Sequence, residues 1–141
     1  MTHFYILACV MTVFHWSMPF STLIPSPWNW LGIILCVAGV GLSGIHARLF
    51  FHLGTNIYTF GEPGQMTTEA FYSRTRNPMY LGLLVTLIGL AVVFGTVSPL
   101  VGPLVFFALA NFWYIPWEER AMATKFGEAY AEYQKSVRRW L

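Results

Sequence analysis

Two short clusters of charged and polar residues have side chains that could bind a small ligand. The first is the stretch RTRNP, residues 74–78, which directly precedes an uncharged run from Met79 to Val97. The second is the adjacent pair Glu118 and Glu119. Arginines bind carboxylates and phosphates through paired N–H groups, whereas carboxylates accept hydrogen bonds from hydroxyls or pair with a cation. Together the clusters predict a ligand with an anionic part and a polyhydroxyl or cationic part.

Asn77 and Pro78 also have a simpler interpretation as a helix start. Proline fits the first turn of a helix, where its missing N–H would be unpaired anyway, and asparagine is a common N-cap. This does not account for Arg74 and Arg76, because the helix dipole favours anions over cations at an N-terminus. Free N–H groups, the positive end of a dipole and arginines together are typical of an anion site. A purely topological role for the two arginines remains the alternative.

The helices that carry these two clusters are predicted to lie in a membrane. The chain has 141 residues, of which 56% are hydrophobic and 10% are charged, whereas a soluble domain carries about 25% charged residues. Every Lys, Arg, Asp and Glu lies either between Arg48 and Arg76 or between Glu118 and Arg139. The rest of the chain divides into four apolar stretches of the length that crosses a bilayer, at about 4–24, 28–51, 79–97 and 100–117.

We therefore predict an all-α integral membrane protein with a single domain over residues 1–141. Four transmembrane helices would form two hairpins, joined by the short turns Pro25-Ser26-Pro27 and Ser98-Pro99. Neither turn carries a charge. The positive-inside rule therefore places the charged segments, about 52–78 and 118–141, in the cytoplasm together with both termini.

The C-terminal segment is predicted to be one amphipathic helix on the cytoplasmic interface. Its apolar residues recur at spacings of three and four, and they are Met122, Phe126, Tyr130, Tyr133, Val137 and Trp140. We interpret most of its charges, Arg139 among them, as solvated. Glu118 and Glu119 are the exception, because two adjacent carboxylates at the membrane exit need partners. Asn111, in the last apolar stretch, is expected to hydrogen-bond to a neighbouring helix.

Other classes of site have less support in the sequence. A net charge of +2 gives no argument for nucleic acid. His46 and His52 are six residues apart and do not share a helix face, so we predict no metal site. We interpret the two histidines as interfacial residues, Arg48 as a cation that reaches the membrane surface, and Cys9 and Cys36 as packing residues.

The two clusters together resemble the isoprenylcysteine carboxyl methyltransferase family, whose members are membrane-embedded, use S-adenosylmethionine and are related in pattern to phospholipid N-methyltransferases. The family signature is an Arg-His/Asn-Pro-x-Tyr-x-Gly run, then two transmembrane helices and a Glu-Glu pair. The matching residues here are Arg76, Asn77, Pro78, Tyr80, Gly82, Glu118 and Glu119. A Gly-Thr-Asn stretch common in bacterial members matches residues 54–56, and the tail FGEAYAEYQKSVRRWL is similar to the family's usual ending. The resemblance covers about Arg48–Leu141.

The resemblance implies S-adenosylmethionine as cofactor and methyl transfer to a lipophilic or membrane-delivered acceptor. The residues implied for the cofactor pocket are Arg76, Asn77, Pro78, Met79, Tyr80, Gly82, Glu118 and Glu119. Arg48, Arg74 and Arg120 are candidates for binding the acceptor, and no catalytic residue is assigned. Ala70-Phe71 stand where the family usually has Gly-Pro, and Asn77 replaces the histidine of members that act on prenylated protein. An isoprenylcysteine-like carboxylate, a phospholipid amine and a small thiol therefore all stay open as acceptors.

Three other classes of protein remain as alternatives. A non-catalytic small membrane assembly protein would not bind S-adenosylmethionine, and a membrane reductase would bind a nicotinamide cofactor instead. A haem or quinone protein would need ligands within the membrane, for which His15 alone is poor support. We expect a bacterial or archaeal cell membrane, with the lipid bilayer as partner and the oligomeric state unknown.

Overall fold

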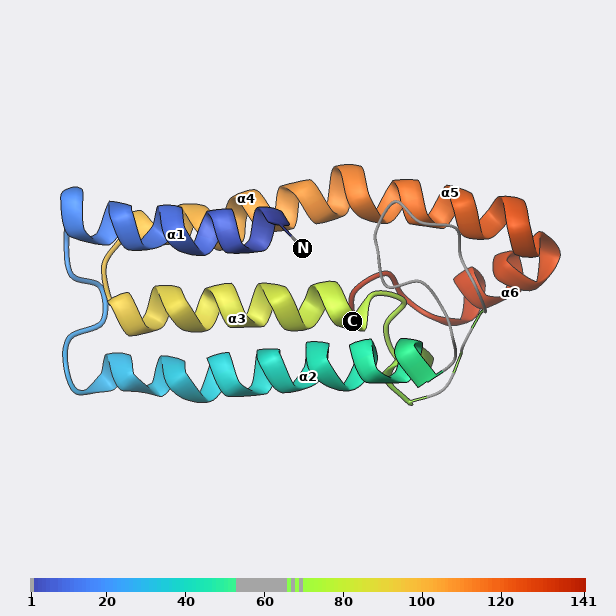
Figure 1. Ribbon diagram of the computed structural model, residues 1–141, viewed down its shortest axis with the longest axis horizontal. Helices are drawn as coiled ribbons and strands as arrows, with labels where there is room; N and C mark the ends of the chain where they lie inside the picture. Colours follow the sequence, from blue (N-terminus) through green and yellow to red (C-terminus); the bar gives the residue numbers. More distant parts are fainter. Residues whose placement is uncertain (1, 53–65, 67, 69) are drawn as a thin grey trace.

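The computed structural model describes residues 2–52, 66, 68 and 70–141, and this part of the chain is helical and contains no β-strand. The α-helices are α1 (Thr2–Ser17), α2 (Gly32–His52), α3 (Pro78–Phe94), α4 (Val101–Leu109), α5 (Ile115–Phe126) and α6 (Glu128–Ser136). Short 3-10 turns are η1 (Trp28–Leu31), η2 (Ala70–Ser73) and η3 (Ser98–Leu100), and a π-helical turn, η4 (Ala110–Tyr114), joins α4 to α5. The helices α1 to α4 run side by side along the long axis (Figure 1).

The helix α2 packs chiefly along α3, and small residues line the contact between them. A Cβ atom added to Gly82 would lie 2.7 Å from the carbonyl oxygen of Gly39 and 2.8 Å from the backbone nitrogen of Ser43. Both distances are too short for real atoms, so glycine is needed for this close approach. The hydroxyl of Ser43 also donates to the carbonyl of Met79 (3.1 Å), which fixes the height of α2 relative to the start of α3.

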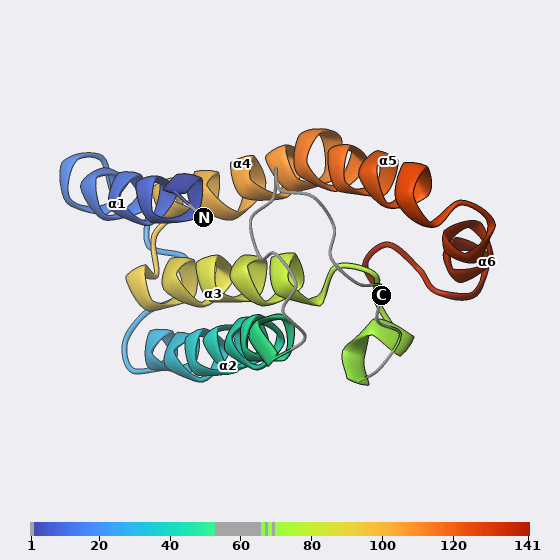
Figure 2. The ribbon, with the colours of Figure 1, turned by 45° about the vertical axis from the view of Figure 1, so that its right-hand side comes forward.

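The other face of α3 contacts α1 and the helix formed by α4 and α5. Figure 2 shows this second layer above the α2–α3 pair. The buried core between these elements is apolar and consists of Leu7, Met11, Leu87, Ala91, Phe106, Ala110, Tyr114 and Ile115. The core therefore holds α3 at the centre of the bundle, with its first residue at one end.

Among the described residues, two helical stretches are long and apolar enough to cross a membrane, Trp28–Leu49 and Ser98–Phe126. The helix α3 is apolar but has 17 residues, and α1 has 16. The predicted first stretch, 4–24, was too long as a helix, because α1 ends at Ser17 and Pro19 and Pro25 follow. Proline lacks the N–H that a helix interior needs.

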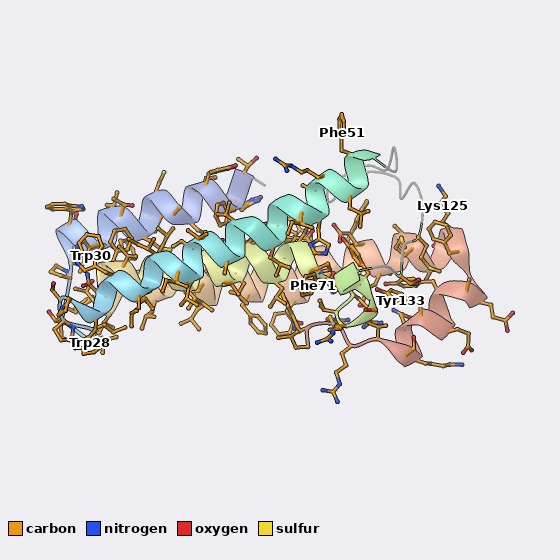
Figure 3. All side chains as sticks on the ribbon, turned by 90° about the horizontal axis from the view of Figure 1, so that it is seen from below. Trp28, Trp30, Phe51, Phe71, Lys125 and Tyr133 are labelled. Carbon is orange, nitrogen blue, oxygen red and sulfur yellow. The ribbon has the colours of Figure 1, made fainter. Side chains whose placement is uncertain are left out.

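The outer faces of the bundle carry many exposed apolar side chains. Large exposed residues on α2 include Ile34, Val37 and Val40, and those after Leu100 include Leu104 and Phe112. Faces of this kind are typical of helices that contact lipid. Figure 3 shows Trp28 and Trp30 at the end of the bundle opposite to Phe71, Lys125 and Tyr133, and both tryptophans are exposed, as expected for an interfacial aromatic belt.

The prediction of a single C-terminal amphipathic helix is wrong. The helix α5 ends at Phe126, because Gly127 has a φ of 52° and a ψ of −122°, which side-chain-bearing residues rarely adopt. The helix α6 then turns away from α5, and the chain is extended at Val137, where φ is −125° and ψ is 133°. The last residues return to the start of α3, where the C-terminus lies (Figure 1). The predicted apolar stripe is therefore divided among α5, α6 and this tail.

Candidate functional site

The candidate site lies at the end of the bundle where α3 begins. The charged residues that the structure describes are at this end, because they lie at the end of α2, before α3, or after Trp117. The opposite end contains the two uncharged connections, residues 18–31 and 95–100. The fold therefore brings the predicted RTRNP and Glu-Glu clusters to the same end of the molecule.

The C-terminal tail, residues 137–141, lies against the residues that precede α3. The backbone N–H of Arg76 donates to the carbonyl of Arg138 (2.9 Å). The side-chain amide of Asn77 and the hydroxyl of Thr75 both donate to the carbonyl of Arg139, at 2.9 and 3.2 Å. The expected capping role of the Asn77 side chain is therefore wrong, because its amide holds the tail and makes no cap hydrogen bond.

The tail is also anchored to the π-helical turn. The indole N–H of Trp140 donates to the side-chain oxygen of Asn111 (3.2 Å), and the ring of Trp140 packs against Phe107 at 5.3 Å between centroids. Asn111 thus has the structural contact that we expected, but its partner is the tail and not a helix. Turns of π-helix are often found at functional sites, and here the turn binds the end of the chain through Asn111.

Glu119 lies between two arginines. One of its oxygens pairs with Arg76 (3.0 Å), and Arg139 makes two contacts, at 2.6 and 3.2 Å. The side chains of Arg76 and Glu119 are 12% and 13% exposed, and that of Arg139 is 36% exposed. The interpretation of Arg139 as a solvated charge is therefore wrong. The three groups carry a net charge of +1, and the buried Nε of Arg76 has no hydrogen-bond partner among the described residues.

Glu118 is held separately, by Tyr80. The hydroxyl of Tyr80 donates to Glu118 at 2.7 Å, and the Tyr80 ring stacks on Tyr114 at 6.0 Å between centroids. Glu118 follows the uncharged part of its helix, which ends at Trp117. Burial raises the pKa of Glu118 to about 7, the hydrogen bond from Tyr80 opposes this shift, and the neighbouring charge of Glu119 adds to it. This carboxyl group therefore titrates near neutral pH.

Three tyrosines that we had not assigned to a site surround the charged cluster. The hydroxyl of Tyr133 donates to the carbonyl of Tyr72 (2.7 Å), and Tyr130 packs against Tyr133. Burial is the main cause that raises the pKa of Tyr130 and of Tyr133 to about 12, while the positive charge of Arg76 lowers both pKa values. The only sequence signal for Tyr130 and Tyr133 was the apolar stripe, which predicts burial and not proximity to Glu119.

The remaining predicted site residues lie elsewhere. Arg48, Arg74 and Arg120 are exposed, and Arg120 donates to the carbonyl of Pro116 on its own helix (3.1 Å). Gly82 lies in the contact between α2 and α3, Pro78 is buried and Met79 is half-buried. Residues 54–56 of the Gly-Thr-Asn stretch lie outside the described residues.

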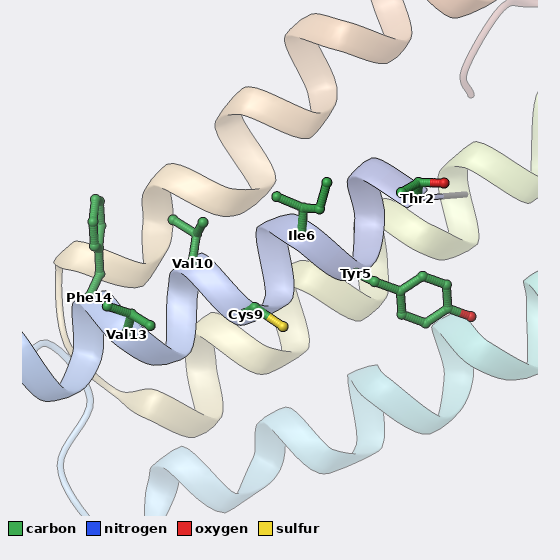
Figure 4. A pocket seen from close by; sticks show the side chains of 7 residues that line it. All are labelled: Thr2, Tyr5, Ile6, Cys9, Val10, Val13 and Phe14. Carbon is green, nitrogen blue, oxygen red and sulfur yellow. The ribbon is translucent and has the colours of Figure 1, made fainter.

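A second surface feature lies on the outer face of α1. It is an apolar groove of about 420 Å³ (Figure 4), lined by Thr2, Tyr5, Ile6, Cys9, Val10, Val13 and Phe14. None of these side chains is charged. The groove suits an apolar neighbour, because it lacks charged groups. The charged groups that a charged ligand needs lie in the RTRNP and Glu-Glu clusters.

Residues 28–129, more than half of the chain, match the phospholipid methyltransferase family. The chain belongs to this family, which confirms the predicted relation to membrane methyltransferases. Over 63 residues, 45% of the chain, it is 36% identical to an uncharacterized protein of Haemophilus influenzae, whose whole length is covered. No solved structure matches the chain. The described residues are helical, and the family together with the two long apolar helices indicates a membrane protein of methyltransferase type.

Proposed function

We propose that this protein transfers a methyl group from S-adenosylmethionine to the amine of a membrane phospholipid. The observation that carries the proposal is the buried cluster at the start of α3. There the Nε of Arg76 has no hydrogen-bond partner among the described residues, and the same side chain pairs with Glu119 at the membrane edge. Membership of the phospholipid methyltransferase family supports the reaction type and favours an amine among the possible acceptors. An isoprenylcysteine-like carboxylate and a small thiol remain alternative acceptors.

The chemistry of the cluster fits S-adenosylmethionine. Arg76 would bind the carboxylate of its amino acid part through Nε, because charge-assisted hydrogen bonds to arginine are strong. Glu118 would accept hydrogen bonds from the ribose hydroxyls or face the sulfonium, and the aromatic pair of Tyr80 and Tyr114 would contact the adenine or the sulfonium. When bound, S-adenosylmethionine supplies an activated methyl group.

Other residues of the site would position these contacts. Glu119 holds Arg76 from one side, so we assign it a positioning role and not the direct contact with the cofactor that the sequence suggested. The tail fixes the backbone of Arg76 and the side chain of Asn77. Methyl transfer requires chiefly that the acceptor be aligned and water excluded, and a buried cluster beside lipid-facing helices suits both needs.

We further propose that the charged end of the bundle faces the cytoplasm together with both termini. The concentration of Lys and Arg at this end supports that orientation. Gly61, which would report the same side in a labelling experiment, lies outside the described residues.

Titration of the purified protein with S-adenosylmethionine and, separately, with NADPH tests the class of cofactor. We expect S-adenosylmethionine to give a heat of binding and NADPH to give none. Incubation with methyl-tritiated S-adenosylmethionine and vesicles should then label phosphatidylethanolamine and leave phosphatidylcholine, which has no free N–H, unlabelled. Binding of NADPH alone would indicate a reductase, and binding of neither compound would indicate an assembly protein.

A further inference from the structure

His46, near the end of α2, is a buried histidine whose protonation can be deduced from its contacts. Its side chain is 0% exposed, and Nδ1 lies 2.7 Å from the carbonyl oxygen of Leu42. A carbonyl oxygen can only accept a hydrogen bond, so Nδ1 carries the proton and donates it. In the neutral ring Nε2 therefore has a free lone pair and can only accept.

No described residue donates a hydrogen bond to the lone pair on Nε2. Nε2 of His46 is buried, and it has no hydrogen-bond partner among the described residues. A buried acceptor without a partner destabilises a fold, and native proteins rarely leave one unexplained. His15, the half-buried histidine of α1, differs because its Nδ1 lies 3.0 Å from the hydroxyl of Thr96. The arrangement of His46 thus points to a donor that arrives with a ligand.

The position of His46 places it at the same end of the bundle as the charged cluster. Ser43 bonds to Met79 in the first turn of α3, and His46 lies about one helical turn beyond Ser43. The His46 ring packs against the rings of Phe71 and Tyr72, at 5.6 and 5.3 Å between centroids. These residues closely precede Arg76 in the chain, so the His46 ring lies against the segment that leads into the cluster.

Tyr72 is the titratable group that packs on His46 from η2, while Phe71 is apolar. Burial is the main cause that raises the pKa of Tyr72, and the negative charge of Glu118 adds to it. The phenol therefore stays protonated at neutral pH and does not act as a base. Among the groups in contact, the imidazole is thus the one that can receive a proton.

We propose that Nε2 of His46 is the proton acceptor for the phospholipid amine, an inference that rests on the proposed function. A phosphatidylethanolamine headgroup is an ammonium at neutral pH and is not nucleophilic in that form. One N–H proton would pass to Nε2, and the freed lone pair on nitrogen would attack the methyl carbon of S-adenosylmethionine. The carbon–sulfur bond breaks, and its electron pair stays on sulfur. The product is an N-methylammonium lipid, and the imidazolium then loses its proton to water.

The kinetic test compares His46→Gln and His46→Asn with the parent protein and with His15→Gln as the matched control. Glutamine and asparagine can each accept or donate a hydrogen bond, but neither can take up a proton. We expect both variants to bind S-adenosylmethionine within about threefold of the parent, and to methylate phosphatidylethanolamine about 10²- to 10⁴-fold more slowly, as for the loss of a general base. His15→Gln should keep the parent rate within about twofold.

A second measurement does not depend on turnover or on the folding of a variant. In histidine ¹⁵N spectra of the parent protein in nanodiscs, phosphatidylethanolamine should shift the Nε2 resonance of His46, while phosphatidylcholine should not. Parent-like turnover in both His46 variants, or identical Nε2 resonances in the two lipids, would overturn the inference. Failure of the parent to bind S-adenosylmethionine would refute the proposed function separately, since the spectra still report the contact between His46 and the amine.

Discussion

The two ends of the bundle are built from different interactions. At the turn end, residues 18–31 and 95–100 are joined by backbone hydrogen bonds, including two to the carbonyl of Gly95, from Leu23 (2.8 Å) and Ile24 (3.1 Å). The side-chain amide of Asn29 adds a bond to the carbonyl of Val93 (2.8 Å). At the site end, neutral hydrogen bonds such as that from the N–H of Arg76 to the carbonyl of Arg138 are joined by ion pairs among Arg76, Glu119 and Arg139.

The two ends therefore differ in what their interactions contribute: those at the turn end close the fold, and those at the site end are candidates for binding a ligand. Neutral hydrogen bonds at the turn end satisfy the backbone groups that a reversal of the chain exposes. Buried ion pairs contribute little to stability, because desolvation offsets much of their attraction. Charges concentrated at one end of an otherwise uncharged bundle are therefore better explained by a ligand than by stability, and natural proteins depart from optimal packing mainly at functional sites.

The largest effect on cofactor binding is expected from Arg76→Ala. A hydrogen bond to a charged group is worth about 1.5 to 3 kcal/mol, so the substitution should weaken S-adenosylmethionine binding about 10- to 100-fold. The protein should stay folded, because Arg139 still neutralises Glu119. Isothermal titration measures the change. Arg138→Ala is the matched control, since the side chain of Arg138 is exposed and only its carbonyl contacts Arg76. Equal affinities in the two variants would mean that the site end serves topology alone.

The uncharged runs and the two charged clusters were sufficient to predict helices with RTRNP and the Glu-Glu pair at one end. Periodicity could not predict the tail, because the apolar stripe continues in register through Gly127, where the helix breaks. The pairing of Glu119 with Arg139 depends on that break, and twenty residues separate the two in the chain.

The sequence was also insufficient to predict the burial and hydrogen bonding of His46. Its spacing from His52 argued against a metal pair, and our interpretation of His46 as an interfacial residue is wrong because its side chain is 0% exposed. The lone pair on Nε2 becomes visible only when the hydrogen bond from Nδ1 to Leu42 and the burial of the ring are known. Such information lies in tertiary contacts with η2, which no local pattern contains.

A smaller effect is expected from pH, through Glu118. Its pKa of about 7 lies above the ordinary value, so the folded state favours the protonated form. Stability from this group is present at low pH and is lost as pH rises through about 7. The ionised form binds a sulfonium or hydroxyl better, so affinity for S-adenosylmethionine should rise about tenfold between about pH 6 and pH 8. Titrations across this range should be flat for Glu118→Gln, and a parent-like slope in that variant would assign the titration to another group.

The smallest effect on binding is expected at the turn end. Asn29→Ala removes the amide that donates to the carbonyl of Val93, near the end of α3, where helical carbonyls lack partners within the helix. Loss of one such hydrogen bond should lower the stability of the fold by about 1 kcal/mol, which thermal unfolding in detergent would detect. Affinity for S-adenosylmethionine per folded molecule should stay within about twofold, because Asn29 contacts α3 at Val93, near its last residue, whereas Arg76 precedes its first residue, Pro78. A selective loss of binding in well-folded Asn29→Ala would show that the two ends are coupled through α3. The conclusion that the turn end only closes the fold, without affecting ligand binding, would then be wrong.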